Sequence, residues 1–146
     1  MQVKFDNYVV TYPVVIHKDG NSDYGVTVPD LPGCFSAGSS MDEALVNVKE
    51  AMECHIKGLV MDNEEVPEPL TIDHHIKNPD YKDGVWALVD FDYGQIEAPM
   101  KIKYKRINVT IPSHLLKRID DYAQAKHLSR SAFITQATVN AMSNTK

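Results

Sequence analysis

The C-terminal end of this chain most constrains its fold, because one strand-like segment is followed there by only two helical ones. Ile107, Val109 and Ile111 alternate with polar residues, which is the pattern of a strand with one buried face. Helical periodicity follows in two stretches, 115–123 and 133–141, separated by the sequence HLSRS. A single strand leaves its backbone unpaired, and so short a segment buries too little apolar area to fold alone. Two chains that pair these strands antiparallel and pool their helices would meet both requirements.

Local signals refine this C-terminal pattern. Pro112 ends the predicted strand, and Ser113 is expected to cap the first helix. A different arrangement is also open, in which the two helices form a further layer on the rest of the chain and present a basic outer surface. The patterning of the strand favours the paired arrangement.

Charge divides the chain near residue 100. The net charge is −5, yet residues 1–100 contain 6 Lys and Arg against 18 Asp and Glu, whereas residues 101–146 contain 9 against 2. Such asymmetry suggests that the two parts meet different partners. Together with Pro99 it predicts one domain at 1–100 and another at 105–146, with a linker near 94–104.

The C-terminal segment resembles the ribbon-helix-helix family of Arc- and MetJ-like repressors in RINVTIP, LLKRIDDYA and LSRSAFI. The resemblance implies a homodimer whose two-stranded ribbon enters the major groove of double-stranded DNA. By position, we expect Arg106, Asn108 and Thr110 to read base edges. Arginine can pair with guanine and asparagine with adenine, and the threonine methyl group can contact thymine.

Phosphate contacts are expected beside these base contacts. The second helix is predicted to begin at Ser129, where first-turn N–H groups and the helix dipole favour an anion, and Arg130 and Ser131 are placed to help. Three lysines before the predicted strand are expected to add sequence-independent phosphate contacts: Lys101, Lys103 and Lys105. His127 stands where the family often has glycine, and we expect it to adopt a positive φ at a modest cost.

The first part of the chain predicts an antiparallel sheet and one amphipathic helix. Strand-forming residues, with turn residues between them, occupy four stretches: 8–17, 24–28, 34–37 and 85–91. Ser40 opens the helix in a capping box with Glu43, and Gly58 and Asn63 are weak stop signals. Apolar residues recur at spacings of three and four along one helical face: Met41, Leu45, Val48, Met52, Ile56 and Leu59. The predicted fold class is α+β.

YPVVIHKD, followed by YGVTVPDLPGCFSAGSSMDEALVNVKEAMECHI, resembles the HicB antitoxin family over about residues 8–92. The resemblance implies a partial ribonuclease-H-like fold that neutralises a small basic HicA-like toxin, which cleaves mRNA. Many HicB proteins also carry a C-terminal DNA-binding domain, and the ribbon-helix-helix type fits the second segment. The implied function is the antitoxin of a type II toxin-antitoxin system that represses its own operon, with assembly beyond the homodimer left open.

Enzymatic activity is not expected. Ribonuclease-H-type catalysis needs several carboxylates around Mg²⁺, and the first two predicted strands contain no Asp or Glu. The other candidates lie in predicted turns or lack a third partner: Asp19, Asp23, Asp30, Asp90 and Asp92. His17, His74 and His75 are expected to be structural, because neighbouring strand residues point to opposite faces and nothing completes a metal shell. We therefore expect neither a metal nor a cofactor.

Composition leaves two further alternatives open. The acidity of residues 1–100 serves either solubility or electrostatic matching to a basic toxin, and the HicB resemblance favours the second. The alternative function is a ribbon-helix-helix repressor that senses a small ligand, which would require a pocket of convergent polar groups. Cys34 and Cys54 are expected to be reduced thiols. With no apolar run near the roughly 20 residues that span a bilayer and no secretory-signal pattern, we expect a cytoplasmic protein.

Overall fold

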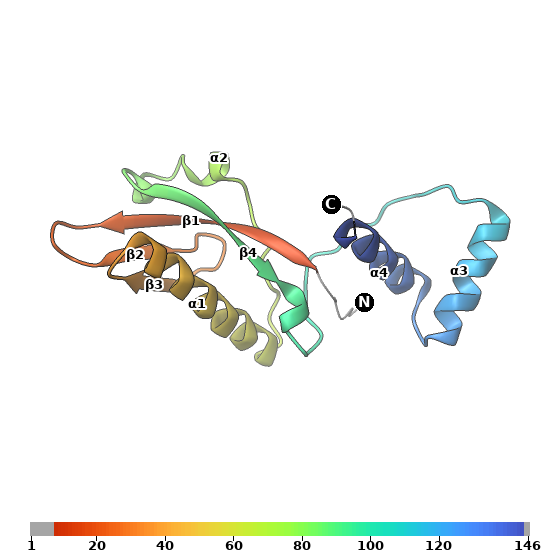
Figure 1. Ribbon diagram of the computed structural model, residues 1–146. Helices are drawn as coiled ribbons and strands as arrows, with labels where there is room; N and C mark the ends of the chain where they lie inside the picture. Colours follow the sequence, from red (N-terminus) through yellow and green to blue (C-terminus); the bar gives the residue numbers. More distant parts are fainter. Residues whose placement is uncertain (1–7, 145–146) are drawn as a thin grey trace.

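The computed structural model describes residues 8–144, which form two regions of different size (Figure 1). The sheet region, residues 8–102, contains four strands and one long helix. The C-terminal region, residues 103–144, contains an extended segment and two helices. The fold is thus mixed α and β, as the sequence predicts. The ends of the two predicted domains, residues 1–7 and 145–146, lie outside the described residues.

The sheet is antiparallel throughout, with the strand order β3-β2-β1-β4. Each strand ends within one residue of its predicted position: β1 (Val9–Lys18), β2 (Tyr24–Thr27), β3 (Phe35–Gly38) and β4 (Val85–Asp92). β1 is central because it is the longest strand and is rich in residues that pack well on a pleated surface. Its Tyr12, Val14 and Ile16 belong to the buried core.

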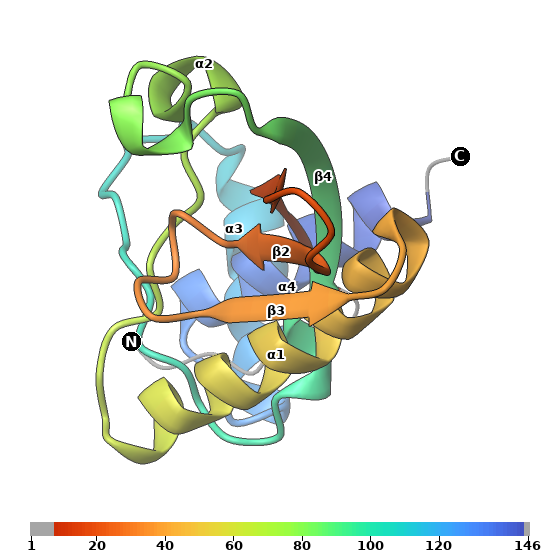
Figure 2. The same ribbon diagram turned by 90° about the vertical axis from the view of Figure 1, so that its left-hand side faces the viewer.

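Helix α1 (Met41–Met61) covers one face of the sheet with its buried residues Ala44, Val48, Met52 and Ile56 (Figure 2). The helix approaches the end of β3 so closely that a Cβ on Gly38 would lie 2.4 Å from the backbone nitrogen of Ala44. Only glycine fits this contact without a shift of backbone. The packing explains why the turn between β3 and α1 is tight.

One hydrogen bond of the predicted capping box of α1 is confirmed, and the other is wrong. Ser40 Oγ accepts from the backbone N–H of Glu43 at 3.0 Å, as predicted. The Glu43 carboxylate, however, accepts from the backbone N–H of Ser39 at 2.6 Å and from the Ser39 hydroxyl, not from Ser40. These bonds lower the pKa of Glu43. Asn63, at φ +58°, follows the end of the helix, whereas Gly58 lies inside it.

Residues 70–84 form a strap that the sequence did not predict, with α2 (Ile72–His75) and the short 3₁₀ helix η1 (Pro79–Tyr81). Asp30 holds it, because Oδ1 accepts from Leu70 N–H at 3.0 Å and lies 2.9 Å from His75 Nε2. The His75 ring stacks on Trp86, with centroids 6.3 Å apart. The strap is therefore fixed by tertiary contacts, and the expectation that the two histidines lie on a strand is wrong.

The chain after β4 stays attached to the sheet region. The 3₁₀ helix η2 (Tyr93–Gln95) follows β4, and Tyr93, Ile96 and Met100 are buried in the same core. Val66 N–H then donates to Lys101 O at 2.6 Å. Most of the predicted linker near 94–104 thus packs on the sheet region, and only the residues after Ile102 leave it.

The two helices of the C-terminal region, α3 (Ser113–Ala125) and α4 (Arg130–Ser143), pack side by side. Tyr122 and Phe133 stack between them, with ring centroids 6.2 Å apart. His127 has φ +57° in the turn, as its place in the sequence predicts. The expected cap at Ser113 is wrong: Pro112 occupies the N-cap position, and no side chain caps the helix.

Candidate nucleic-acid interface

The segment 103–111 is extended but pairs with no strand within residues 8–144. The alternation that predicts a strand is present, yet in one chain no neighbour completes the ladder, so the predicted strand is not formed. Ile107 and Val109 are 70% and 66% exposed, although both are β-branched apolar residues suited to a buried strand face. A single chain therefore leaves both sides of this segment open to solvent.

The predicted base-reading residues lie at alternate positions of that segment. Arg106, Asn108 and Thr110 are all exposed, and they alternate with the apolar residues. Their guanidinium, amide and hydroxyl groups are the types that contact base edges. In one chain all three side chains are accessible to solvent.

The three lysines are divided between the two regions. Lys101 is anchored through its carbonyl to Val66, and Lys103 lines a hollow of about 280 Å³ beside Glu68 and Tyr93. Lys105 lies on the extended segment itself. All three side chains are exposed, but only Lys105 adjoins the predicted base-reading residues.

The N-terminus of α4 forms as the sequence predicts. Ser129 is the N-cap residue, and its hydroxyl accepts from Ala132 N–H at 3.1 Å. Ser131 is exposed in the first turn. The backbone N–H groups of a first helical turn lack helical partners and carry the positive end of the dipole, which suits a phosphate.

Arg130, the first residue of α4, has a partner that the sequence analysis missed. Its Nε and Nη2 donate to the two carboxylate oxygens of Asp120 in α3, each at 2.8 Å. These bonds lower the pKa of Asp120 and raise that of Arg130. The available signal was the presence of only two acidic residues, Asp120 and Asp121, among the last 46. Their facing position, however, depends on the helix–helix packing.

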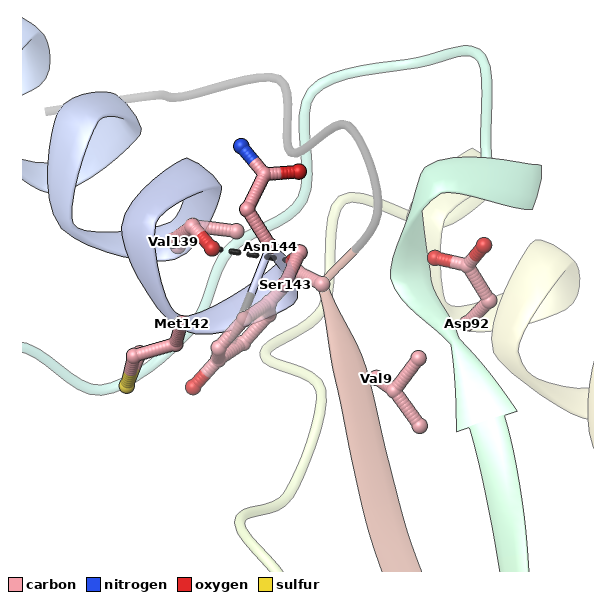
Figure 3. Close-up of a pocket in the computed structure, with 7 residues that line it drawn as sticks. Val9, Asp92, Val139, Met142, Ser143 and Asn144 are labelled. Atoms are coloured by element: carbon pink, nitrogen blue, oxygen red, sulfur yellow. Dashed lines mark hydrogen bonds between the residues drawn. The ribbon is translucent and has the colours of Figure 1, made fainter. Parts of the chain in front are cut away.

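A hollow of about 500 Å³ lies where the end of α4 meets the start of β1 (Figure 3). Two of its polar side chains already form hydrogen bonds within the chain. Asp92 Oδ1 accepts from Gly94 N–H at 2.8 Å, and Ser143 Oγ donates to Val139 O at 2.9 Å. The convergent polar pocket that a ligand-sensing repressor would need is not formed by these side chains.

The carboxylates of the sheet region do not converge. Asp90 accepts from the Thr11 hydroxyl at 2.6 Å, while Asp30 faces the strap and is buried. Among residues 8–144, no group of three or more His, Cys, Asp or Glu side chains could hold a metal ion. His75 in the strap is buried against Asp30 and Trp86, and His74 is exposed.

The two cysteines are separate thiols, one buried and one exposed. Burial raises the pKa of the Cys34 thiol to about 11, so this group stays protonated at neutral pH. In the described part of the chain, no helix has the length and apolar character needed to cross a membrane.

Comparison with known proteins connects both regions to one family. The model of the family described as "HicB_like antitoxin of bacterial toxin-antitoxin system" matches residues 12–138. A 14.9 kDa protein of Haemophilus phage HP1, encoded in the rep-hol intergenic region, is 41% identical over 133 residues, which are 90% of this chain and 96% of that protein.

Two solved structures are similar as well. The antitoxin HicB of Burkholderia pseudomallei has a TM-score of 0.59 and 39% identity, and the similarity covers 90% of this chain and 98% of that one. The separately crystallised N-terminal domain of the B. pseudomallei HicB antitoxin has a TM-score of 0.50 and 38% identity, over 57% of this chain and 99% of that one. Because the family match extends across most of both regions, this chain belongs to the HicB-like antitoxin family, a non-enzymatic component of bacterial toxin-antitoxin systems.

Proposed function

We propose that this protein is the antitoxin of a type II toxin-antitoxin system. In the cytoplasm it binds and neutralises a HicA-like, mRNA-cleaving toxin, and as a dimer it represses its own operon by sequence-specific binding to double-stranded operator DNA. The toxin binds the sheet region, and the DNA binds the C-terminal region.

Family membership and charge support the toxin-binding half of this proposal. The family match begins at residue 12 and includes nearly all of the sheet region. Residues 1–100 carry 18 acidic against 6 basic side chains, which would attract a basic protein and oppose wrong partners. In this proposal the sheet region is a partial ribonuclease-H-like fold that serves as a docking surface, since its carboxylates form no catalytic cluster.

The exposed apolar side of the segment 103–111 is the observation that carries the DNA-binding half. An extended backbone without a partner, next to two exposed β-branched residues, is an incomplete structure. A second copy that pairs antiparallel would complete the hydrogen-bond ladder and bury Ile107 and Val109 against the pooled helices. The result is a ribbon-helix-helix dimer.

Such a dimer gives each polar group a role in binding. Arg106, Asn108 and Thr110 would project from the ribbon into the major groove and read base edges. The N-terminus of α4, with Ser129, Arg130 and Ser131, would hold a backbone phosphate. A second set would add sequence-independent contacts as the chain leaves the sheet region: Lys101, Lys103 and Lys105.

The test separates the two activities in one protein. The triple variant Arg106→Ala, Asn108→Ala, Thr110→Ala should lose operator binding but keep full inhibition of the toxin's RNA cleavage, because the three side chains lie on the solvent side of the ribbon. Toxin ribonuclease activity and operator binding are measured side by side for the triple variant and the wild type. If the triple variant still represses, or if it folds but no longer inhibits the toxin, the modular proposal is wrong.

A further inference from the structure

Asp120 is unusual because it places a carboxylate in a strongly basic segment. Residues 101–146 contain 9 Lys and Arg but only 2 acidic residues, and Asp120 is one of the two. Both of its oxygens accept from Arg130, yet the two side chains are 43% and 55% exposed. Exposed ion pairs contribute little to stability. A bidentate pair can contribute more than a typical exposed one, and this pair also fixes the direction of the Arg130 guanidinium.

The geometry leaves part of Arg130 available. A guanidinium carries five N–H groups in a planar fork, and Asp120 occupies one edge of it through Nε and Nη2. The remaining N–H groups lie on the other edges. Arg130 is also the first residue of α4, so these groups lie beside the positive end of the helix dipole.

We propose that Asp120 is a positioning residue, which holds Arg130 so that the free edge of its guanidinium meets a DNA phosphate at the N-terminus of α4. This inference rests on the proposed DNA-binding function. The planar fork makes arginine suited to this task, because one edge can bind a carboxylate while another binds a phosphate. An unpositioned arginine would lose side-chain entropy on binding, and the bond to Asp120 reduces that cost before DNA arrives.

The neighbouring residue supplies a matched control. Asp121 is exposed on the same helix and forms no ion pair within residues 8–144. Asp121→Asn therefore removes the same charge as Asp120→Asn but leaves Arg130 in place. The difference between the two variants separates positioning from simple repulsion between a carboxylate and DNA.

The experiment uses the full-length protein and a random-sequence DNA duplex, with affinity measured over a series of salt concentrations. Asp121→Asn should bind as tightly as the wild type or more tightly, with an unchanged salt slope. Asp120→Asn should bind roughly three- to tenfold more weakly than Asp121→Asn, with a slope flatter by roughly one unit per protomer, because one phosphate contact is lost. Asp120→Glu should recover most of the affinity.

Two changes at Arg130 test whether the effect of Asp120 on DNA binding acts through this arginine and not through the stability of the fold. In an Arg130→Ala background the two asparagine variants should bind equally, since there is no arginine left to position. Arg130→Lys, which keeps the charge but loses the fork, should behave like Asp120→Asn. Circular dichroism melts set a common temperature at which all variants are folded.

The inference is overturned if Asp120→Asn binds DNA as tightly as Asp121→Asn or more tightly, because Asp120 would then act only through its charge. It is also overturned if the two variants still differ in the Arg130→Ala background. Wild-type protein that binds neither this duplex nor its own promoter region would instead refute the proposed DNA-binding function, and the inference with it.

Discussion

The core of the sheet region and the extended segment 103–111 differ in how far their apolar side chains are buried. In the sheet region, Val14 and Met52 are completely buried between β1 and α1. In the C-terminal region, Ile107 and Val109 are exposed, as are the polar residues with which they alternate. The strands of the sheet region thus find partners within one chain, whereas the segment 103–111 pairs with no strand within residues 8–144.

Size and connectivity explain the difference. The sheet region joins four strands and a 21-residue helix, so each element finds a partner within the chain. The C-terminal region has helices of 13 and 14 residues and a single unpaired extended segment. Segments this short bury too small a share of their surface to be stable alone. In the proposed dimer, a second copy would supply the missing surface.

Deletion of residues 105–146 should have the largest effect of the changes considered. The remaining chain, 1–104, should stay folded because it retains Met100 and the bond between Val66 and Lys101, but it should lose the dimer and all DNA binding. Size-exclusion chromatography with light scattering measures the assembly state, and circular dichroism checks the fold. A truncated chain that is still dimeric and still binds the operator would contradict the division into two regions.

Met52→Ala should lower the free energy of unfolding of the sheet region by about 2–5 kcal/mol, because truncation of this fully buried side chain leaves a cavity in its place. The cost should be the same at all protein concentrations, since Met52 lies within one chain. Chemical denaturation at two widely separated concentrations tests this. Met61→Ala, at an exposed position near the end of the same helix, serves as the control and should change stability little.

Arg106→Ala and Asn108→Ala should each cost about 1–3 kcal/mol of operator binding and relax the preference at one base pair per half-site. The sheet region should be unaffected, so toxin inhibition stays at the wild-type level. Competition binding against a panel of substituted operators measures the preference. Uniform loss of affinity across the panel would show that these side chains contact phosphates instead.

Val109→Ala should have a moderate effect, but it tests the proposed dimer contact most directly. In a single chain the side chain is mostly exposed, so its truncation should change little. In a dimer it should cost about 1.6 kcal/mol per chain, from two buried methylene equivalents, and the cost should depend on protein concentration. Sedimentation equilibrium gives the dimer dissociation constant. No change in that constant would mean that the apolar side of the segment is not the dimer contact.

Several local features followed from the sequence because neighbouring residues determine them. The four strands and α1 were predicted from alternation and from the spacing of apolar residues, and His127 was predicted to adopt a positive φ. The Ser40 cap was also foreseen, but the Glu43 carboxylate bonded one residue earlier than expected. Small shifts of this kind arise because the exact chain direction at a helix start depends on what the helix packs against.

Other features depended on contacts between distant residues. The strap at 70–84 carries only weak helical signals, and it is held by Asp30, some 40 residues earlier. The sequence predicts Asp30 in a turn, and the structure confirms this, but only the packing of the strap buries its side chain. The pairing of Asp120 with Arg130 likewise needs α3 and α4 to be packed together before the two residues face each other.

The sequence alone was enough to place the four strands, α1, α3 and α4, to locate the change in charge near residue 100, and to show which family the chain resembles. These properties are encoded in periodicity and residue type, which act over a few neighbouring positions. Only the tertiary structure decided that the predicted linker packs on the sheet region, that Arg130 has a carboxylate partner, and that the segment 103–111 is unpaired in one chain. Each of these depends on which surfaces meet in three dimensions, because burial and hydrogen bonding join residues that are far apart in the sequence.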